Sequence, residues 1–224
     1  VILFDIDETL FDFQKTEKEA LKNTFIEFNL QYEENFHLAK YKEMNKVLWK
    51  KLEENQISLK ELKNKRFEKY LENLSIDINY EIFNKAYIKN LGRGSFLLPK
   101  AQDTVKALSQ NHQLAVITNG FEDVQKPRIE NSRLSEYFKE IIISESVNYS
   151  KPHPSIFEIA LKNLKFFDKS KVLMVGDSLS SDIQGGINFG IDTCWYNPNN
   201  IEPKESIKAN YIIKSLDELI PLVK

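Results

Sequence analysis

Four short apolar runs, each ending directly in a polar loop, constrain the fold of this chain more than any other feature. The runs cover residues 1–4, 114–117, 141–143 and 172–175. Such continuous apolar runs are typical of strands buried on both faces of a parallel sheet. Stretches with helical character lie between them, at residues 101–110, 154–164 and 182–188. This alternation predicts an α/β fold with a doubly wound, Rossmann-like parallel sheet.

Residues 13–91 follow a different pattern. Charged segments there carry apolar residues at three- and four-residue spacing, such as Ala20, Leu21, Phe25 and Phe28. This periodicity is typical of amphipathic helices, and we find no strand-like pattern in the segment. We therefore expect an all-helical cap at 13–91, inserted after the first strand of a core formed by 1–12 and 92–224.

Composition narrows the possible partners. The 31 Lys and Arg residues nearly balance the 33 Asp and Glu residues, so no overall charge favours nucleic acid or an acidic membrane surface. No apolar run approaches the roughly 20 residues that span a bilayer. The single cysteine, Cys194, cannot form an internal disulfide. We expect a cytoplasmic protein, either a monomer or a small homo-oligomer, that acts on a small molecule.

Acidic residues follow two of the predicted strands. Asp5 and Asp7 come directly after the first run, and Asp177 and Asp182 follow the run at 172–175. Two acids in one loop could equally form a helix cap or a solvated turn. However, the carboxyl ends of parallel strands meet at one edge of the sheet, so the four acids are expected to converge. Hard oxygen ligands in that number, without His or Cys nearby, suit Mg²⁺.

Groups suited to phosphate follow the other strands. Thr118 offers a hydroxyl, and the loop beside it offers main-chain N–H groups. Lys151 supplies a positive charge just ahead of a predicted helix, and Pro152 biases it toward an extended conformation. These residues predict an anion site beside the acids.

The four loops together resemble the motifs of the haloacid dehalogenase superfamily, in the order and with the spacing of that family. The similar strings are Asp5-Ile6-Asp7-Glu8-Thr9, Thr118-Asn119-Gly120, Lys151-Pro152 and Gly176-Asp177-Ser178 through Asp182. The resemblance covers the whole chain, and the helical insert stands where the family carries its first type of cap.

The resemblance implies a Mg²⁺-dependent phosphomonoester hydrolase. Asp5 would attack phosphorus and form a phosphoryl-aspartate, and Asp7 would serve as general acid and then general base. The resemblance assigns Mg²⁺ to Asp5, the main-chain carbonyl of Asp7, Asp177 and Asp182, the last acting through water or Lys151. Phosphate would be held by Thr118 and Lys151, and substrate also by Asn119 and Gly120.

A finer resemblance concerns the substrate. Strings such as Asn119-Gly120-Phe121, Val124-Gln125 and Cys194-Trp195-Tyr196-Asn197 are similar to the bacterial pyrimidine 5′-nucleotidases, which act on nucleoside monophosphates, including non-standard ones. In the cap, Trp49 could stack on a base and Arg66 could contact its polar edge. Packing or helix ion pairs account for both residues more simply.

Several alternatives remain at this stage. A sugar-phosphate or acylneuraminate phosphatase would share the motifs, and so would a phosphomutase. A haloacid dehalogenase would not carry an acid at position 7, because halide leaves without a proton. A non-catalytic binding module would be expected to lose Asp5, Asp7, Lys151 or Asp177, and all four are present.

Overall fold

The chain forms two compact units in a computed structural model, which describes residues 1–53, 56–202 and 206–223. The first unit comprises Val1–Phe13 and Ser95–Lys224, and the second comprises Gln14–Gly94. The sequence-based limits of the insert, 13–91, differ from these limits by one residue at the start and three at the end.

The first unit is built on a six-stranded parallel sheet. Its strands are β1 (Ile2–Phe4), β2 (Leu114–Thr118), β3 (Phe138–Ile143), β4 (Leu173–Gly176), β5 (Asp192–Tyr196) and β6 (Tyr211–Ile213). Their order across the sheet is β3-β2-β1-β4-β5-β6, and every neighbouring pair is parallel. The strand order reverses direction at β1, so β1 lies between β2 and β4. The predicted doubly wound α/β fold is confirmed.

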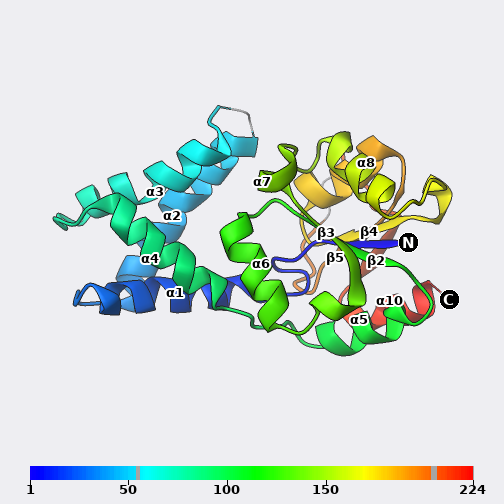
Figure 1. Cartoon of the computed structure of the whole chain (residues 1–224), viewed down its shortest axis with the longest axis horizontal. Coiled ribbons are helices and arrows are strands. Elements are labelled where there is room, and N and C mark those ends of the chain that lie inside the picture. The colour runs from blue at the N-terminus through cyan, green and yellow to red at the C-terminus, as the bar shows by residue number, and fades with distance from the viewer. Residues whose placement is uncertain (54–55, 203–205, 224) are drawn as a thin grey trace. The chain divides into compact units, whose positions relative to one another are not determined.

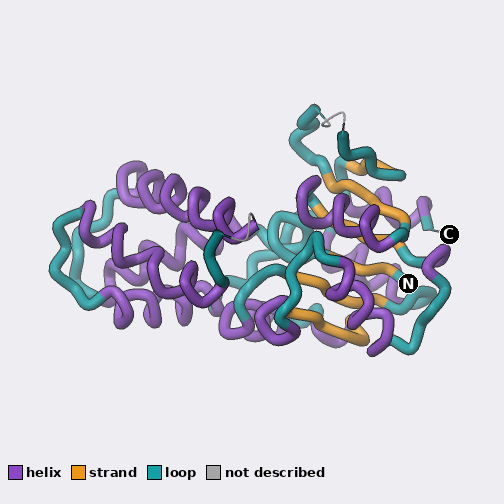
Figure 2. Tube along the Cα trace, turned by 90° about the horizontal axis from the view of Figure 1, so that it is seen from above, coloured by secondary structure: helices purple, strands orange, loops and turns teal. Residues whose placement is uncertain are grey.

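Helices cover both faces of this sheet. They are α5 (Ala101–Ser109), α6 (Glu122–Asn131), α7 (Ser144–Val147), α8 (Pro154–Asn163), α9 (Gln184–Phe189) and α10 (Leu219–Leu222). Figure 1 shows α8 on one side of the strands and α5 and α10 on the other, and Figure 2 shows the strands side by side between helices. Alternate strand residues feed two apolar layers, since Phe4 packs with the α5 side and Leu3 with the α8 side. Burial on both faces explains the continuous apolar runs.

In the residues that the structure describes, the second unit consists of four helices. They are α1 (Phe13–Glu27), which begins in the first unit, α2 (Glu34–Glu53), α3 (Leu59–Asn73) and α4 (Tyr80–Gly92). Aromatic rings fill its core: Phe25 and Phe83 meet edge to face at 5.7 Å, and Tyr41 stacks on Phe67 at 5.4 Å. Helix α3 starts at a capping box, in which Ser58 and Glu61 exchange hydrogen bonds. In the described part of this unit, no residue is in a strand.

Short irregular helices complete the chain, at η1 (Ser135–Tyr137), η2 (Lys169–Lys171), η3 (Leu179–Ile183) and η4 (Leu216–Glu218). Of these, η3 is a single turn of π-helix that runs into α9. The helix expected at 182–188 is therefore split between η3 and α9. Among the described helices, none is long and apolar enough to cross a membrane.

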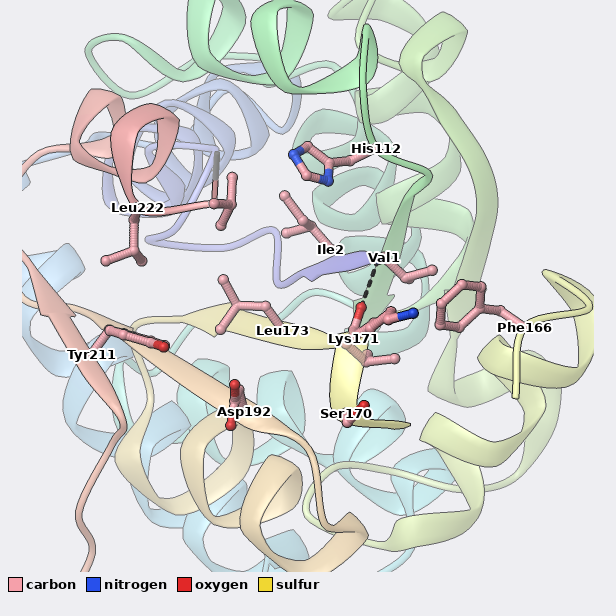
Figure 3. A pocket seen from close by; sticks show the side chains of 12 residues that line it. Val1, Ile2, His112, Phe166, Ser170, Lys171, Leu173, Asp192, Tyr211 and Leu222 are labelled. Atoms are coloured by element: carbon pink, nitrogen blue, oxygen red, sulfur yellow. Dashed lines mark hydrogen bonds between the residues drawn. The ribbon is translucent and has the colours of Figure 1, made fainter. Parts of the chain in front are cut away.

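A hollow of about 410 Å³ lies at the amino ends of the strands (Figure 3). Its lining includes Ile2 of β1, Leu173 of β4 and Asp192 of β5. The acids that follow β1 and β4 stand at the opposite ends of these strands. The hollow is therefore separate from the site described next.

Candidate active site

The loop after β1 holds Asp5 and Asp7 at the carboxyl end of the strand. Asp5 continues the sheet, because its N–H donates to the carbonyl of Val175 in β4 at 2.9 Å. The chain then turns tightly, and the carbonyl of Ile6 accepts a hydrogen bond from the N–H of Leu10 at 2.8 Å. The buried apolar strand and this turn fix where the two carboxylates begin.

Lys151 lies at the centre of a buried ionic cluster. Its Nζ donates to Asp5 Oδ1 at 2.5 Å, to Asp182 Oδ1 at 2.7 Å and to the carbonyl of Ile117 at 2.7 Å. An ammonium group has three donors, so these contacts use all of them. Only 3% of Lys151 is exposed. Burial opposes its charge, but Asp182 and Asp5 outweigh that effect and raise the pKa of Lys151.

Asp177 and Asp182 come from the loop after β4. Trp195 Nε1 donates to the main-chain carbonyl of Asp177 at 2.7 Å, and Ser178 N donates to Asp182 Oδ2 at 3.0 Å. Gly176 makes this packing possible, because a Cβ there would lie 2.2 Å from Asp182 Oδ2. A side chain at position 176 would displace the acid that pairs with Lys151.

Three carboxylates converge in this cluster and could hold a metal ion. Oxygen atoms of Asp5, Asp177 and Asp182 all lie within 4.8 Å of one another. Thr9 joins two of them, since its hydroxyl lies 3.2 Å from Asp5 Oδ2 and 3.4 Å from Asp177 Oδ1. A set of carboxylate oxygens suits a hard divalent cation such as Mg²⁺. The donor chemistry therefore fits the ion that the sequence predicted.

The cluster carries more negative than positive charge, and the pKa values of two of its carboxyl groups are raised. Burial, together with the charges of Asp5 and Asp182, raises the pKa of Asp177 to about 9. Burial also raises the pKa of Asp5 to about 7, against the opposing effect of Lys151. Without a cation, Asp5 and Asp177 therefore stay protonated to a higher pH in the folded state than in the unfolded state, where they lose their protons near pH 4. The stability of the metal-free protein should fall as pH rises from about 4 toward 9.

We predict that Asp177→Asn stabilises the metal-free protein and abolishes its response to Mg²⁺. At pH 8 in EDTA, the variant should melt a few degrees above wild type, because the asparagine side chain is neutral without binding a proton. A gain of about 1 kcal/mol shifts Tm by roughly 2–4 °C at this size. This gain should vanish below about pH 3, where Asp177 is protonated in both the folded and the unfolded state. Thermal melts with and without Mg²⁺ across this pH range measure both effects.

The matched control is Asp103→Asn, an acid-to-amide change at an exposed position of α5. It should melt like wild type and keep the Mg²⁺-induced rise in Tm. An undiminished Mg²⁺ response in Asp177→Asn would contradict the assignment of Asp177 as a metal ligand.

The second motif has a different structural role at each of its residues. Thr118 ends β2, and its Oγ1 accepts from Gly120 N at 3.3 Å and from Gln125 Nε2 at 3.1 Å. Its own O–H hydrogen is therefore directed away from these two groups. Asn119 makes two hydrogen bonds to the main chain of Lys151. Its Nδ2 donates to the Lys151 carbonyl at 2.8 Å, and its Oδ1 accepts from the Lys151 N–H at 2.7 Å. A direct substrate contact by Asn119 or Gly120 stays a prediction.

Two residues of α6 hold Asp7, and the sequence did not single out their role. Arg128 Nη1 donates to Asp7 Oδ1 at 2.6 Å, and Gln125 Nε2 donates to Asp7 Oδ2 at 2.6 Å. The sequence gives Gln125 only within a string similar to the nucleotidases, and it gives no pattern that marks Arg128. Their three-residue spacing places both on one face of a helix, which is a signal that could have linked them.

The two predicted cap residues lie within the helical unit. Trp49 is half-buried on α2. Arg66 on α3 is only 3% exposed, its Nε donates to Asn84 Oδ1 at 3.2 Å, and its guanidinium lies 5.0 Å from the Tyr87 ring centre. These contacts fit the simpler interpretation of Arg66 as a packed residue. A substrate contact by either residue stays a prediction.

Comparison with known proteins places this site in a family. The sequence profile of the haloacid dehalogenase-like hydrolases matches residues 1–190. Pyrimidine 5′-nucleotidase YjjG from Escherichia coli is 37% identical to this chain over 99% of the chain and 96% of its own length. Pyrimidine 5′-nucleotidase PynA from Streptococcus pneumoniae is 35% identical, over 98% and 92%.

A solved structure shows the same architecture. The HAD-hydrolase YfnB from Bacillus subtilis, crystallised with magnesium bound, superposes with a TM-score of 0.92 at 33% identity. The match covers 99% of this chain and 97% of that one. The chain therefore belongs to the haloacid dehalogenase-like hydrolases, and the resemblance inferred from its four motifs is confirmed.

Proposed function

We propose that this hydrolase is a Mg²⁺-dependent phosphatase that acts through a phosphoryl-aspartate on Asp5 and hydrolyses pyrimidine nucleoside monophosphates. The observation that carries the proposal is the pairing of two unlike carboxylates after β1. Asp5 lies within the cluster of Lys151, Asp177 and Asp182, whereas Asp7 bonds to α6 outside that cluster. Unlike surroundings suit two carboxylates to two different roles.

In the first step, a carboxylate oxygen of Asp5 attacks phosphorus and the ester P–O bond breaks. The electron pair of that bond leaves with the substrate oxygen, which takes a proton from Asp7. The Thr118 hydroxyl, whose hydrogen is directed away from Gly120 and Gln125, would donate to a phosphate oxygen. The product alcohol then departs and phosphate remains on Asp5.

In the second step, Asp7 takes a proton from water, and the resulting hydroxide attacks phosphorus. The bond between phosphorus and the Asp5 oxygen breaks, which releases inorganic phosphate and restores both side chains. Asp7 thus gives a proton in one step and regains one in the next, so no proton acceptor from outside the site is required.

A divalent cation fits the acids beside this chemistry. Asp5, Asp177 and the main-chain carbonyl of Asp7 would hold Mg²⁺, with Asp182 acting through Lys151. Bound there, the ion would offset the repulsion between the Asp5 carboxylate and the phosphate dianion. Lys151 keeps Asp5 oriented through its 2.5 Å contact, and its charge adds to this electrostatic support.

The substrate proposal rests on the two nucleotidases that match nearly the whole chain, the cap included. Phosphate is common to every phosphomonoester, so discrimination must involve the leaving group. The helical insert, which contains none of the four motifs, is the part suited to that task.

A phosphate-release assay tests activity and substrate together. The panel is dUMP, dTMP and UMP against glucose 6-phosphate, a sialic acid 9-phosphate and p-nitrophenyl phosphate, each with Mg²⁺ or with EDTA. We expect the highest kcat/KM for a pyrimidine nucleotide, and loss of activity in EDTA.

The panel separates two ways of failing. A higher kcat/KM for either sugar phosphate than for every nucleotide would refute the nucleotidase proposal and leave the phosphatase mechanism intact. Failure to release phosphate from any ester with Mg²⁺ would refute the phosphatase proposal itself.

A further inference from the structure

Arg128 is a fully buried arginine whose charge is directed at Asp7. It is one of the largest completely buried side chains in the described part of the chain, and its Nη1 lies 2.6 Å from Asp7 Oδ1. Its guanidinium carbon lies 5.0 Å from the ring centre of Phe11 and 5.4 Å from that of Phe13. Burying a guanidinium is unfavourable unless the charge is paired, and packing alone would favour an apolar side chain. The pairing with Asp7 therefore calls for an explanation beyond packing.

Gln125 completes the contact from one helical turn earlier. Its Oε1 accepts from Arg128 Nη1 at 2.8 Å, so its amide nitrogen faces the other way. That nitrogen donates to Asp7 Oδ2 at 2.6 Å and to Thr118 Oγ1 at 3.1 Å. One amide group thereby links the carboxylate of Asp7 to the hydroxyl proposed to bind phosphate.

Gly120 provides the space for this arrangement. A Cβ at position 120 would lie 2.4 Å from Gln125 Nε2 and 2.6 Å from its Cγ. An alanine there would displace the Gln125 side chain. The glycine of the second motif thus has a role in seating Gln125, apart from any contact with substrate.

We propose that Gln125 and Arg128 form a clamp on α6 that positions the Asp7 carboxylate for proton transfer. The inference rests on the proposed function, in which Asp7 is the acid and base. Each carboxylate oxygen has two lone pairs, and the clamp engages one on each oxygen. The second lone pair of either oxygen stays available for a proton. Fixing the plane of the carboxylate keeps that lone pair directed at the substrate oxygen or the attacking water. A small misorientation would lower the rate of proton transfer.

The clamp makes a kinetic prediction that a purely structural role does not. A 2,4-dinitrophenolate leaving group departs without a proton, so phosphorylation of Asp5 by its phosphate ester does not need Asp7. A nucleoside is a poor leaving group and needs the proton, and hydrolysis of phosphoryl-Asp5 needs Asp7 as base. Loosening the clamp should therefore slow the nucleotide reaction and the second step, but spare formation of the phosphoryl-enzyme from the dinitrophenyl ester.

The test uses Gln125→Leu and Arg128→Met, with Gln102→Leu at an exposed position of α5 as the matched control. We expect kcat for dUMP to fall about 10- to 100-fold in both variants, with KM little changed. This loss is smaller than the factor of about 10²–10⁴ that general acid–base catalysis typically contributes, because Asp7 itself is still present. With the dinitrophenyl ester, stopped flow should show a rapid burst of one phenolate per enzyme, followed by slow turnover. Gly120→Ala should behave like Gln125→Leu. The control should behave like wild type.

Two measurements keep the outcomes distinct. Each variant must retain the wild-type rise in Tm with Mg²⁺, which shows a folded metal cluster, and Gln125→Leu serves if Arg128→Met does not fold. If wild type hydrolyses no ester, or if Asp7→Asn lacks the burst, the proposed function fails and the clamp fails with it. The clamp alone is overturned if Asp7→Asn shows the burst while Gln125→Leu forms the phosphoryl-enzyme more slowly by the same factor from both esters in single-turnover experiments. It is also overturned if Gln125→Leu loses no rate with either ester.

Discussion

Replacing Asp5 by asparagine is expected to lower kcat for every phosphomonoester by at least about 10⁴-fold, the scale typical when a catalytic nucleophile is removed. An amide is a poor nucleophile and a weaker ligand for a cation. The substitution also removes the 2.5 Å ion pair with Lys151, but Lys151 keeps its contacts with Asp182 and the carbonyl of Ile117. The fold should therefore survive, which thermal melts can verify beside the phosphate-release assay.

Asp103→Asn, the exposed acid-to-amide change on α5, is the matched control and should keep full activity. Asp5→Ala guards against slow deamidation of the introduced asparagine, which would restore the wild-type residue. Substantial turnover by Asp5→Ala, in a preparation that melts cooperatively, would mean that another group attacks phosphorus.

Asp7→Asn is the second large effect. We expect kcat for dUMP to fall by about 10²–10⁴, because an amide can neither protonate the nucleoside nor activate water. The Mg²⁺-induced rise in Tm should persist, since the predicted metal contact at this residue is its main-chain carbonyl. Tm itself should fall, because the buried guanidinium of Arg128 loses a charged partner.

Leaving-group dependence separates the roles of Asp7 from a general loss of structure. In Asp7→Asn, phosphorylation by 2,4-dinitrophenyl phosphate should stay fast while the phosphoryl-enzyme accumulates. If rates with dUMP and with the dinitrophenyl ester fell by the same factor in single-turnover experiments, Asp7 would not be the acid.

Much of the fold follows from local sequence. The runs at 1–4, 114–117 and 172–175 read as buried parallel strands because both faces of the sheet are covered, and β1, β2 and β4 occupy them almost residue for residue. The strand β6 was not predicted. It has three residues, two of which are exposed, so it lacks the buried apolar run that identifies the other strands.

Helix α6 shows where local pattern gives little guidance. Pro127 lies inside it, and its buried residues include Gln125 and Arg128 beside Val124 and Ile129. Polar residues facing inward weaken the apolar stripe that identifies a helix from sequence. Their inward direction makes sense only once Asp7, 118 and 121 residues away in the chain, stands opposite them.

In the candidate site, too, some features follow from local sequence and others depend on tertiary packing. Asp5, Asp7, Asp177 and Asp182 were predicted to converge because they follow neighbouring parallel strands. The structure brings the carboxylates of Asp5, Asp177 and Asp182 together around Lys151. The Asp7 carboxylate is bonded to α6 instead. Contacts between loops that are distant in sequence, such as Asn119 with the Lys151 main chain, could not be foreseen. For Arg66, the sequence left both a ligand contact and packing open, because the burial of this side chain depends on how α3 packs against α4.

Trapping the phosphoryl-enzyme tests the central claim most directly. Asp7→Asn would be mixed with 2,4-dinitrophenyl phosphate and Mg²⁺, quenched, and reduced with borodeuteride, which converts an acyl phosphate to a deuterated alcohol. We predict that peptide mass spectrometry finds homoserine carrying deuterium at position 5 and nowhere else, in step with the burst of phenolate. Label at another residue, or a full burst with no label at position 5, would contradict phosphoryl transfer to Asp5.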